Sequence, residues 1–468
     1  MNDPWHRHRS EPLLAPVPFE NGRVLAWAAL QEAARTGRFL QDVLASLEHC
    51  HHLSQSERAL AVDLASGVTR RLRTLDALIA SCLSRPRENT EPELWQVLRL
   101  GACQLFFART PPHAAVNSSV ELCRSLRRDR WTGFVNGVLR NLARLVLDQP
   151  ASGPSSSSLP IKPGQWLALN SPILPDPTLH RTEWLGTAFS LPHALAERWT
   201  STLSDDEQIH AGFFFNEPPQ TTLRVNQLRT SRDQLRQLLE AAGCSSEIGS
   251  LEHSLHLSHA GPPERLPGYA EGLWSIQDEA AQHAAILLNP KPGEHILDLC
   301  AAPGGKTTHL AELSHDQAHI HACDVSNTRL DRVRQNTQRL QLHSIQTHLI
   351  SKDGQGIPPV SFDAALVDVP CSNTGVLHRR PEARWRFNPT ELSELAALQT
   401  QLLLTAAKSL RPGGRLLYST CSLEPEENSG VIQAALALLP QFSLVKQALH
   451  KPGSPADGAF QALMERHS

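Results

Sequence analysis

The chain has 468 residues, of which 40% are hydrophobic, and its 44 lysines and arginines nearly balance its 47 aspartates and glutamates, for a formal net charge of −3. A chain of this length and apolar content can bury the cores of several domains, which excludes a wholly disordered protein. The near balance of charge excludes a general polycation that coats nucleic acid, so any such contact must use a local basic patch.

The sequence shows no targeting signal and no disulfide pattern. Residues 1–10 are polar, and no stretch approaches the roughly 18 apolar residues that a membrane-spanning helix needs. Nine cysteines in a chain of this length are too sparse for a disulfide scaffold. We therefore expect a reduced, cytoplasmic, monomeric protein without a membrane partner.

The first 288 residues divide into three segments by pattern. Residues 1–148 carry apolar residues at helical spacing and no strand-like alternation, which predicts an all-helical domain. Residues 149–177 are rich in proline and serine, and we expect an exposed linker there because proline breaks regular elements. Residues 178–288 mix both patterns, with a strand at Thr222–Asn226 and a helix at Asp233–Ala242, so they predict a small α+β subdomain.

From residue 289 to residue 468, short apolar runs alternate with longer helical runs. The predicted strands are 295–299, 320–324, 347–350, 364–368 and 415–420, and the helices between them include 307–313, 329–340 and 392–410. Repeated strand–helix units predict an α/β domain with an open, mostly parallel, Rossmann-like sheet that helices cover on both faces. Ligands of such sheets bind at the carboxyl ends of the strands.

A turn of small residues follows the first of these strands and opens a helix. It consists of Cys300, Ala301, Ala302, Pro303, Gly304, Gly305 and Lys306. Small residues let a ligand approach the backbone, and a helix N-terminus offers free N–H groups. A phosphate-binding P-loop is excluded, because its first glycine would have to stand where Cys300 stands.

Three acids follow the ends of the next strands: Asp324, Asp353 and Asp368. Any one of them alone is more often a solvated loop residue or a helix cap. Together with the glycine turn they favour a nucleoside-containing cofactor, because an acid after the second strand is well placed to bind ribose hydroxyls.

Two cysteines also follow predicted strands, Cys371 after 364–368 and Cys421 after 415–420. A cysteine is more often a packing residue, but these two are flanked by Pro, Ser or Thr, as at the rim of a cleft. Thiols at a sheet edge suit methylation of cytosine C5, because a thiolate that adds to C6 makes C5 nucleophilic. A zinc deaminase would need a cysteine where Thr374 stands, so no metal site is expected.

These motifs resemble those of the Sun-type RNA cytosine-5 methyltransferases. The resemblance is carried by Cys300–Lys306, by Asp368–Ser372, and by Thr420–Ser422 followed by Glu424–Asn428. Within that family the chain looks like the bacterial RsmB (Sun/Fmu) subfamily, whose members methylate one cytosine of small-subunit (16S) ribosomal RNA. That subfamily carries a NusB-like N-terminal domain, and Phe134–Arg140 is similar to its hallmark.

The resemblance implies roles for the motif residues. Cys421 would be the nucleophile, Cys371 would assist release of the product, and Asp368 would lie near both the methyl donor and the cytosine. Residues 300–306 would surround S-adenosylmethionine, with Asp324 at its ribose and Asp353 on its adenine side.

Two positions depart from the pattern of this family. The family usually has Ala where this chain has Val369, and Gly where it has Asn373, so both residues add bulk to the wall of the cleft.

A basic patch with one aromatic residue closely follows Cys371. Because arginine binds phosphate and an aromatic ring stacks on an unpaired base, we expect Arg379, Arg380 and Arg384 to contact the ribosomal RNA. Two alternatives stay open: a cytosine-5 methyltransferase that acts on transfer RNA, and a non-catalytic RNA-binding scaffold, against which the intact cysteines and acids argue.

Overall fold

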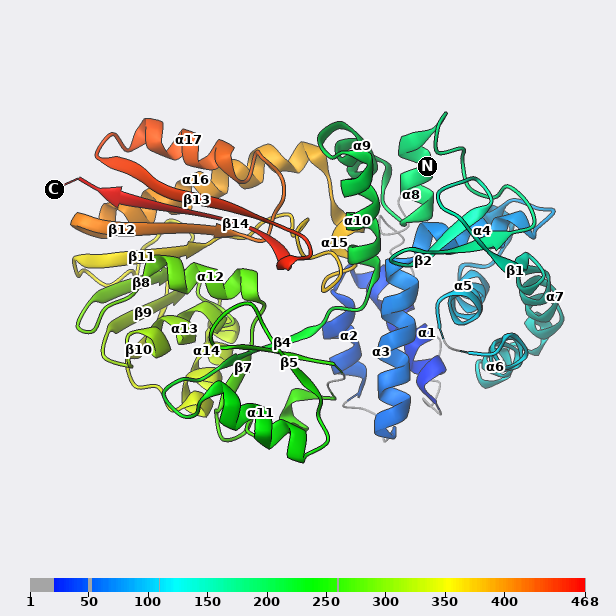
Figure 1. Ribbon diagram of the computed structural model, residues 1–468, viewed down its shortest axis with the longest axis horizontal. Coiled ribbons are helices and arrows are strands. Elements are labelled where there is room, and N and C mark those ends of the chain that lie inside the picture. Colours follow the sequence, from blue (N-terminus) through cyan, green and yellow to red (C-terminus); the bar gives the residue numbers. More distant parts are fainter. Residues whose placement is uncertain (1–20, 49–52, 109, 259–260, 468) are drawn as a thin grey trace. The chain divides into compact units, whose positions relative to one another are not determined.

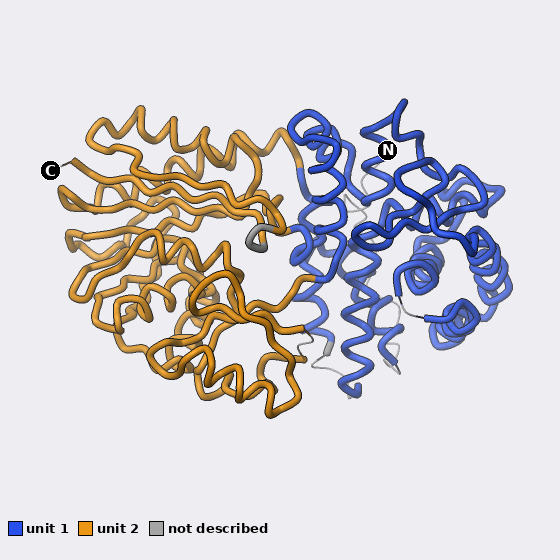
Figure 2. Tube along the Cα trace, viewed as in Figure 1, with its two compact units in different colours: residues 1–218, 377–387 blue, residues 219–376, 388–468 orange. Residues whose placement is uncertain are grey.

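The computed structural model describes residues 21–48, 53–108, 110–258 and 261–467, so the first 20 residues of the expected helical domain lie outside the described part. The chain divides into two compact units (Figure 2). Unit 1 comprises Met1–Pro218 with Leu377–Phe387, and unit 2 comprises Pro219–Val376 with Asn388–Ser468. In the described residues, no helix is long and apolar enough to cross a membrane.

Unit 1 begins with a helical bundle built around α5 (Pro92–Phe106), most of whose residues are buried. Asn21 caps α1 through its side chain, and Gly37 ends this helix in the left-handed conformation. Asparagine and glycine are the residue types preferred at these two helix ends. The all-helical prediction is therefore confirmed for the described residues from Asn21 to Ala143, whereas the last residues of the segment 1–148 belong to strand β1 (Val146–Ala151). The other helices of this bundle are α1 (Gly22–Thr36), α2 (Leu40–Glu48), α3 (Gln55–Arg70), α4 (Leu72–Ser81), α6 (Pro112–Ser125) and α7 (Thr132–Ala143).

The predicted linker 149–177 contains regular structure, so the expectation of an irregular segment is wrong. The strands β1 (Val146–Ala151), β2 (Ser158–Lys162) and β3 (Gln165–Leu169) form an antiparallel sheet in the order β1-β3-β2. Pro150 and Pro160 lie on its two outer strands, which have a neighbour on one side only and therefore tolerate proline. Buried Leu159 and Trp166 fix this sheet against the unit.

The expected α+β subdomain 178–288 is shared between the units. Its helices α8 (Arg181–Ala188), α9 (His193–Thr202) and α10 (Asp205–Asn216) belong to unit 1, as does the short α15 (Ala383–Arg386). Its strands belong to unit 2, where they form an antiparallel sheet in the order β5-β6-β4-β7. These elements are β4 (Thr221–Val225), α11 (Arg232–Ala241), β5 (Ser246–Ile248), β6 (Ser254–Leu257) and β7 (Trp274–Ile276).

The larger sheet of unit 2 has, within the described residues, the strand order β10-β9-β8-β11-β12-β14-β13 (Figure 1). The strands from β10 to β12 are parallel, and β14 pairs antiparallel with both of its neighbours. The expected Rossmann-like sheet is thus confirmed. Its strands are β8 (His295–Leu299), β9 (His319–Asp324), β10 (Ile345–Leu349), β11 (Phe362–Asp368), β12 (Leu410–Thr420), β13 (Phe442–Lys451) and β14 (Ser454–Arg466).

Helices cover both faces of this sheet. Alternate residues of β11 point to opposite sides: Ala365 and Val367 pack with residues of α16 and α17, whereas Ala364 and Leu366 pack with residues of α12 and α13. The strand order reverses between β8 and β11, which makes their carboxyl ends the place where such sheets bind ligands. The helices are α12 (Glu279–Leu288), α13 (Gly305–Leu313), α14 (Asn327–Leu340), α16 (Leu392–Ser409) and α17 (Ser429–Leu438).

Candidate active site

The two cysteines expected to react lie side by side at the carboxyl edge of the large sheet. β11 and β12 are parallel neighbours in which Asp368 pairs with Ser419, so the loops that follow them leave the same edge. The Sγ atoms of Cys371 and Cys421 are 3.1 Å apart, and both residues are reduced thiols. Both side chains are partly exposed, so the structure brings this pair together where another molecule can reach it.

The buried carboxylate of Glu427 ties the two cysteine loops to each other. It accepts hydrogen bonds from the backbone N–H of Ser372 (2.9 Å) and from the hydroxyls of Ser372 and Ser422, the residues that directly follow the two cysteines. The side chain of Gln399 donates to the same carboxylate (2.9 Å). Glu427 has no exposed surface whereas both cysteines are partly exposed, so this network joins the two loops on their buried side.

Asn373 lies against both cysteines. Its backbone is left-handed (φ 62°), and its amide Nδ2 donates to the carbonyl oxygen of Cys371 (2.8 Å). The Sγ of Cys421 donates to its Oδ1 (3.3 Å). The extra bulk expected at this position is therefore an amide that contacts the predicted nucleophile.

The two thiols share one hydrogen bond, which affects the acidity of Cys371. This bond with Cys421, and then burial, raise the pKa of Cys371 well above its usual range. Cys371 is therefore a protonated thiol at neutral pH. Cys300 is also kept neutral, because burial raises its pKa to about 12.

The glycine turn after β8 contains two residues with a left-handed backbone. Cys300 and Gly304 have positive φ (70° and 100°), and Gly304 is the N-cap of α13. A Cβ at Gly304 would lie 3.2 Å from the backbone of Val333 on α14, so only glycine fits without a shift. Beneath the turn, Thr307 Oγ1 donates to buried Asp298 (2.6 Å), and burial raises the pKa of Asp298 to about 7.

The three predicted acids occupy different surroundings. Asp324 is buried at the end of β9, where it accepts from the N–H of Ser326 (3.0 Å) and pairs with Arg329 (3.3 Å). Asp368 at the end of β11 pairs with Lys306 at 2.6 Å. Asp353 is exposed on a turn after β10. Asp368 thus links the glycine turn to the cysteine loops.

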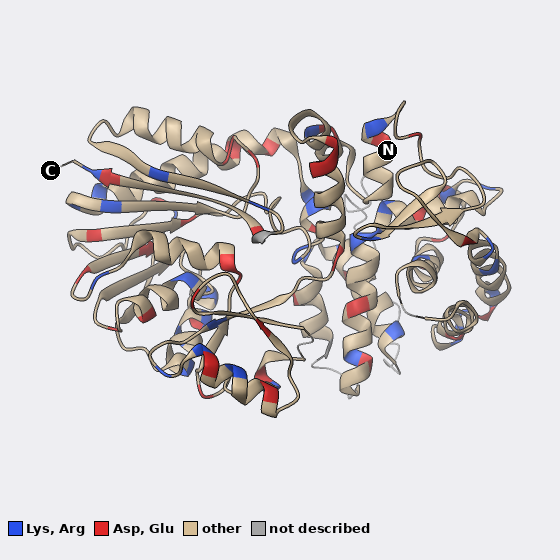
Figure 3. Ribbon diagram, in the orientation of Figure 1, with Lys and Arg blue, Asp and Glu red and all other residues tan. Residues whose placement is uncertain are grey.

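The predicted RNA-binding arginines do not share one environment. Arg384 has no exposed surface, and its guanidinium donates to the carbonyls of Arg70 (2.9 Å) and Phe215 (2.8 Å) within unit 1. The expectation that Arg384 contacts RNA is therefore wrong, because burial closes it to phosphate. Arg379 is half-buried and Arg380 is exposed. Basic and acidic residues are otherwise interspersed over both units (Figure 3).

Three family models match the chain. The model described as 16S rRNA methyltransferase RsmB/F matches residues 285–464, the NusB family model matches 20–144, and the ferredoxin-like domain of RsmF/B-like methyltransferases matches 191–263. A probable ribosomal RNA small subunit methyltransferase B from Synechocystis is 36% identical over 89% of both chains. The corresponding protein from Cronobacter sakazakii is 35% identical over 91% of this chain and 92% of its own.

The chain belongs to this methyltransferase B family. Solved structures have a fold similar to that of this chain. The structure of PH0851 matches 97% of this chain and 100% of its own with a TM-score of 0.75 at 24% identity. A methyltransferase homologue from Pyrococcus horikoshii matches 60% of this chain and 97% of its own with a TM-score of 0.53 at 29% identity.

The methyl donor of this family is S-adenosylmethionine, and the residues at the sheet edge fit it. The turn 300–305 consists of small residues before the N-terminus of α13, so the backbone is open to close approach. Asp324 stands at the end of the second strand in sheet order, the position that suits ribose hydroxyls. Beside the turn, the charges of Lys306 and Asp368 neutralise one another.

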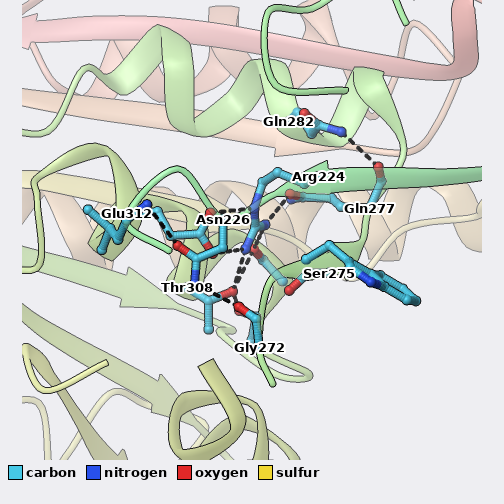
Figure 4. A network of polar contacts seen from close by, with 12 residues as sticks. Arg224, Asn226, Gly272, Ser275, Gln277, Gln282, Thr308 and Glu312 are labelled. Atoms are coloured by element: carbon cyan, nitrogen blue, oxygen red, sulfur yellow. Dashed lines mark hydrogen bonds and ion pairs between the residues drawn. The ribbon is translucent and has the colours of Figure 1, made fainter. Parts of the chain in front are cut away.

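Sequence patterns missed a buried network behind the glycine turn. Arg224 of β4 points toward α13 (Figure 4) and forms a double hydrogen bond with Glu312 (2.8 and 2.9 Å). The same guanidinium donates to the carbonyl oxygen of Gly305 (2.7 Å) and to Thr308 Oγ1 (3.0 Å). Burial raises the pKa of Glu312, and Arg224 opposes that rise. A lone arginine in a strand gives no signal of a partner 88 residues away.

Proposed function

We propose that this protein transfers a methyl group from S-adenosylmethionine to C5 of one cytosine in small-subunit ribosomal RNA, through a covalent bond between Cys421 and C6. The observation that carries the proposal is the pair of thiols 3.1 Å apart at the sheet edge. A methyltransferase that acts on a nitrogen or oxygen atom needs no thiol nucleophile, because those atoms carry lone pairs of their own.

The chemistry follows from the weak nucleophilicity of C5. The thiolate of Cys421 adds to C6 with its electron pair, which breaks the conjugation of the ring and places electron density on C5. When bound, S-adenosylmethionine would supply an electrophilic methyl group, to which the electron pair on C5 bonds as the methyl–sulfur bond breaks, with S-adenosylhomocysteine as the leaving group. Loss of the C5 proton to a base and departure of the Cys421 thiolate then restore the aromatic ring.

Cys371 would act when the product leaves. Its hydrogen is held at neutral pH because the bond with Cys421 and burial raise its pKa. A protonated thiol next to the Sγ of Cys421 can donate to that sulfur as the bond to C6 breaks. Its role would be to release the RNA rather than to form the first bond.

The cofactor would lie along the glycine turn. Residues 300–306 would surround it, Asp324 would bind its ribose, and Asp353 would lie on its adenine side. Lys306 would orient Asp368, with which it pairs at 2.6 Å, between the methyl donor and the cytosine. Burial opposes the charge of Lys306, but Asp368 outweighs this effect and raises the pKa of that lysine.

Ribosomal RNA is the proposed substrate because of the chain's domain content. The NusB and ferredoxin-like models match the chain alongside the methyltransferase model. The relatives that match about nine-tenths of its length are named ribosomal RNA small subunit methyltransferase B.

The described residues contain no cluster of three or more His, Cys, Asp or Glu side chains that could hold a metal ion.

A labelling experiment tests the proposal. The protein is incubated with tritiated S-adenosylmethionine and either ribosomal or transfer RNA, and the RNA is digested to nucleosides. We expect labelled 5-methylcytidine from ribosomal RNA, and no label with Cys421→Ala. Label in any other nucleoside would contradict C5 chemistry, and label from transfer RNA alone would contradict the ribosomal substrate.

The second cysteine gives a further prediction. Without Cys371, the methylated base should stay bonded to Cys421, so Cys371→Ala should accumulate an RNA–protein adduct that resists denaturing electrophoresis. The double variant Cys371→Ala/Cys421→Ala is the matched control and should form none. An adduct that persists in this double variant would rule out Cys421 as the nucleophile.

A further inference from the structure

The side chain of Asn373 bridges the two catalytic loops by way of both ends of its amide. Its Nδ2 donates to the carbonyl oxygen of Cys371 at 2.8 Å. A carbonyl oxygen can only accept, so this bond fixes the amide with its Oδ1 on the other side. That Oδ1 accepts from the Sγ of Cys421 at 3.3 Å.

An amide oxygen in this position favours one protonation state of the sulfur. It can accept the S–H hydrogen of a thiol, whereas it offers no hydrogen to a thiolate. A hydrogen bond made only to the neutral form of a group stabilises that form. The nucleophile must lose this proton before it adds to C6, so the contact acts on the first step of the reaction.

The other ionisable groups around Cys421 are separate from this amide. Cys371 lies 3.1 Å away on the loop after β11, and Lys306 of α13 attracts a negative charge on Cys421. Lys306 is itself paired with Asp368, and Glu427 lies behind the loops, bonded to Ser372. Asn373→Gly removes none of these ionisable groups, although it also removes the hydrogen bond to the carbonyl oxygen of Cys371 within the same loop.

We propose that Asn373 is a further catalytic residue, which holds the nucleophile Cys421 as an oriented thiol until a base enters the site. The inference rests on the proposed function, because that function makes Cys421 the reacting group. In the bound state the entering base would displace this contact, and the sulfur would then be released for addition.

The backbone of Asn373 makes the test clean. Its φ of 62° is left-handed, a conformation that glycine adopts without strain, so Asn373→Gly removes the side chain at little cost in stability. Asn289 supplies a matched control, because it is exposed and also left-handed (φ 53°), at the end of α12. Asn289→Gly makes the same substitution at a position outside the cysteine loops.

The measurement is the rate at which iodoacetamide alkylates Cys421 as a function of pH, followed by peptide mass spectrometry on the full chain without RNA or cofactor. A neutral hydrogen bond is worth about 1 kcal/mol, so Asn373→Gly should move the midpoint of this profile down by about half to one pH unit. Asn373→Asp should move it up, because a carboxylate disfavours a second negative charge. Asn289→Gly should leave it unchanged.

A profile for Asn373→Gly that coincides with that of the unaltered protein would overturn the inference, as would a midpoint that moves up. The acidic limb of the methylation rate should move down in the same variant. Because alkylation needs neither RNA nor methyl transfer, it still reports on Asn373 if no 5-methylcytidine forms. The failure of this inference and the failure of the proposed function are therefore distinguishable.

Discussion

Two ionisable side chains at the glycine turn, half-buried Lys306 and buried Asp298, have different charge states because their surroundings differ. Lys306 keeps its charge, because Asp368 lies 2.6 Å away and outweighs the cost of burial. Asp298 has the hydroxyl of Thr307 on one oxygen, and its buried Oδ1 has no hydrogen-bond partner among the described residues. Burial therefore raises the pKa of Asp298 to about 7, and this acid takes up a proton when the chain folds.

Asp298→Asn should make the protein more stable at high pH than at low pH, relative to the unaltered chain. The folded pKa of about 7 lies above the unfolded value of about 3.9, so the stability that the bound proton contributes is present below pH 4 and disappears as pH rises to about 7. Asparagine has no such dependence on pH. The unfolding free energy of the variant minus that of the unaltered protein, measured with urea, should increase by about 2–4 kcal/mol between pH 4 and pH 8. The same difference in unfolding free energy at both pH values would contradict the raised pKa of Asp298.

At the scale of helices and strands, apolar patterning predicted the parallel part of the large sheet. β8 has the predicted bounds, and β9 to β12 lie within about five residues of theirs, because each contains a short run of apolar residues, such as Ala364–Val367 of β11, which helices cover on both faces. Patterning missed β13, whose residues after Phe442 are mostly exposed. It also missed β14, because polar Gln461 interrupts the apolar residues of this strand. In the structure Gln461 is buried, and its side chain donates to the carbonyl oxygen of Ala280 (2.6 Å).

The prolines of residues 149–177 wrongly predicted an irregular segment, and the reason is physical. A proline breaks a strand only where its missing N–H would have paired, and that depends on which strands become outer strands of a sheet. Pro150 and Pro160 lie on outer strands, which residue type alone does not reveal. The proximity of Cys371 and Cys421 was easier to predict from the sequence. Residues that follow parallel strands lie at one edge of the sheet, however far apart they are in the sequence.

The contact between β4 and α13 can be tested with paired substitutions. Arg224→Met leaves the carboxyl group of Glu312 buried without its guanidinium, which should cost about 3–5 kcal/mol of unfolding free energy. The double variant Arg224→Met/Glu312→Gln carries no buried charge at this place and should recover a large part of that stability. Urea unfolding of the two single variants and the double variant measures the coupling. Additive effects would show that the two side chains do not depend on each other.

At the scale of the whole molecule, the chain leaves unit 2 shortly after the Cys371 loop and returns to it before α16. The intervening segment, Leu377–Phe387, belongs to unit 1, where Glu382 accepts from the N–H of Leu40 (2.6 Å) and Trp385 donates to the carbonyl oxygen of Thr69 (2.9 Å). Arg384 is buried there as well. The sequence shows basic and aromatic residues shortly after Cys371, but it does not show which of these residues are buried by a distant part of the chain.

Arg379 and Arg380 of this segment keep exposed surface and remain candidates for RNA binding. Arg386 is exposed as well, but its guanidinium donates to the carbonyl oxygen of Gly37 and lies over the ring of Phe39. Arg379→Ala/Arg380→Ala should weaken binding of ribosomal RNA and lower the salt dependence of log K by about 1 for each phosphate that the variant no longer binds, since counterion release scales with the number of bound phosphates. Affinity for S-adenosylmethionine should stay the same, because the glycine turn belongs to unit 2. Arg85→Ala, which removes another exposed arginine of unit 1, is the control in filter binding at several salt concentrations. Equal RNA affinity and salt slope in the double variant and the unaltered protein would exclude Arg379 and Arg380 from the RNA interface.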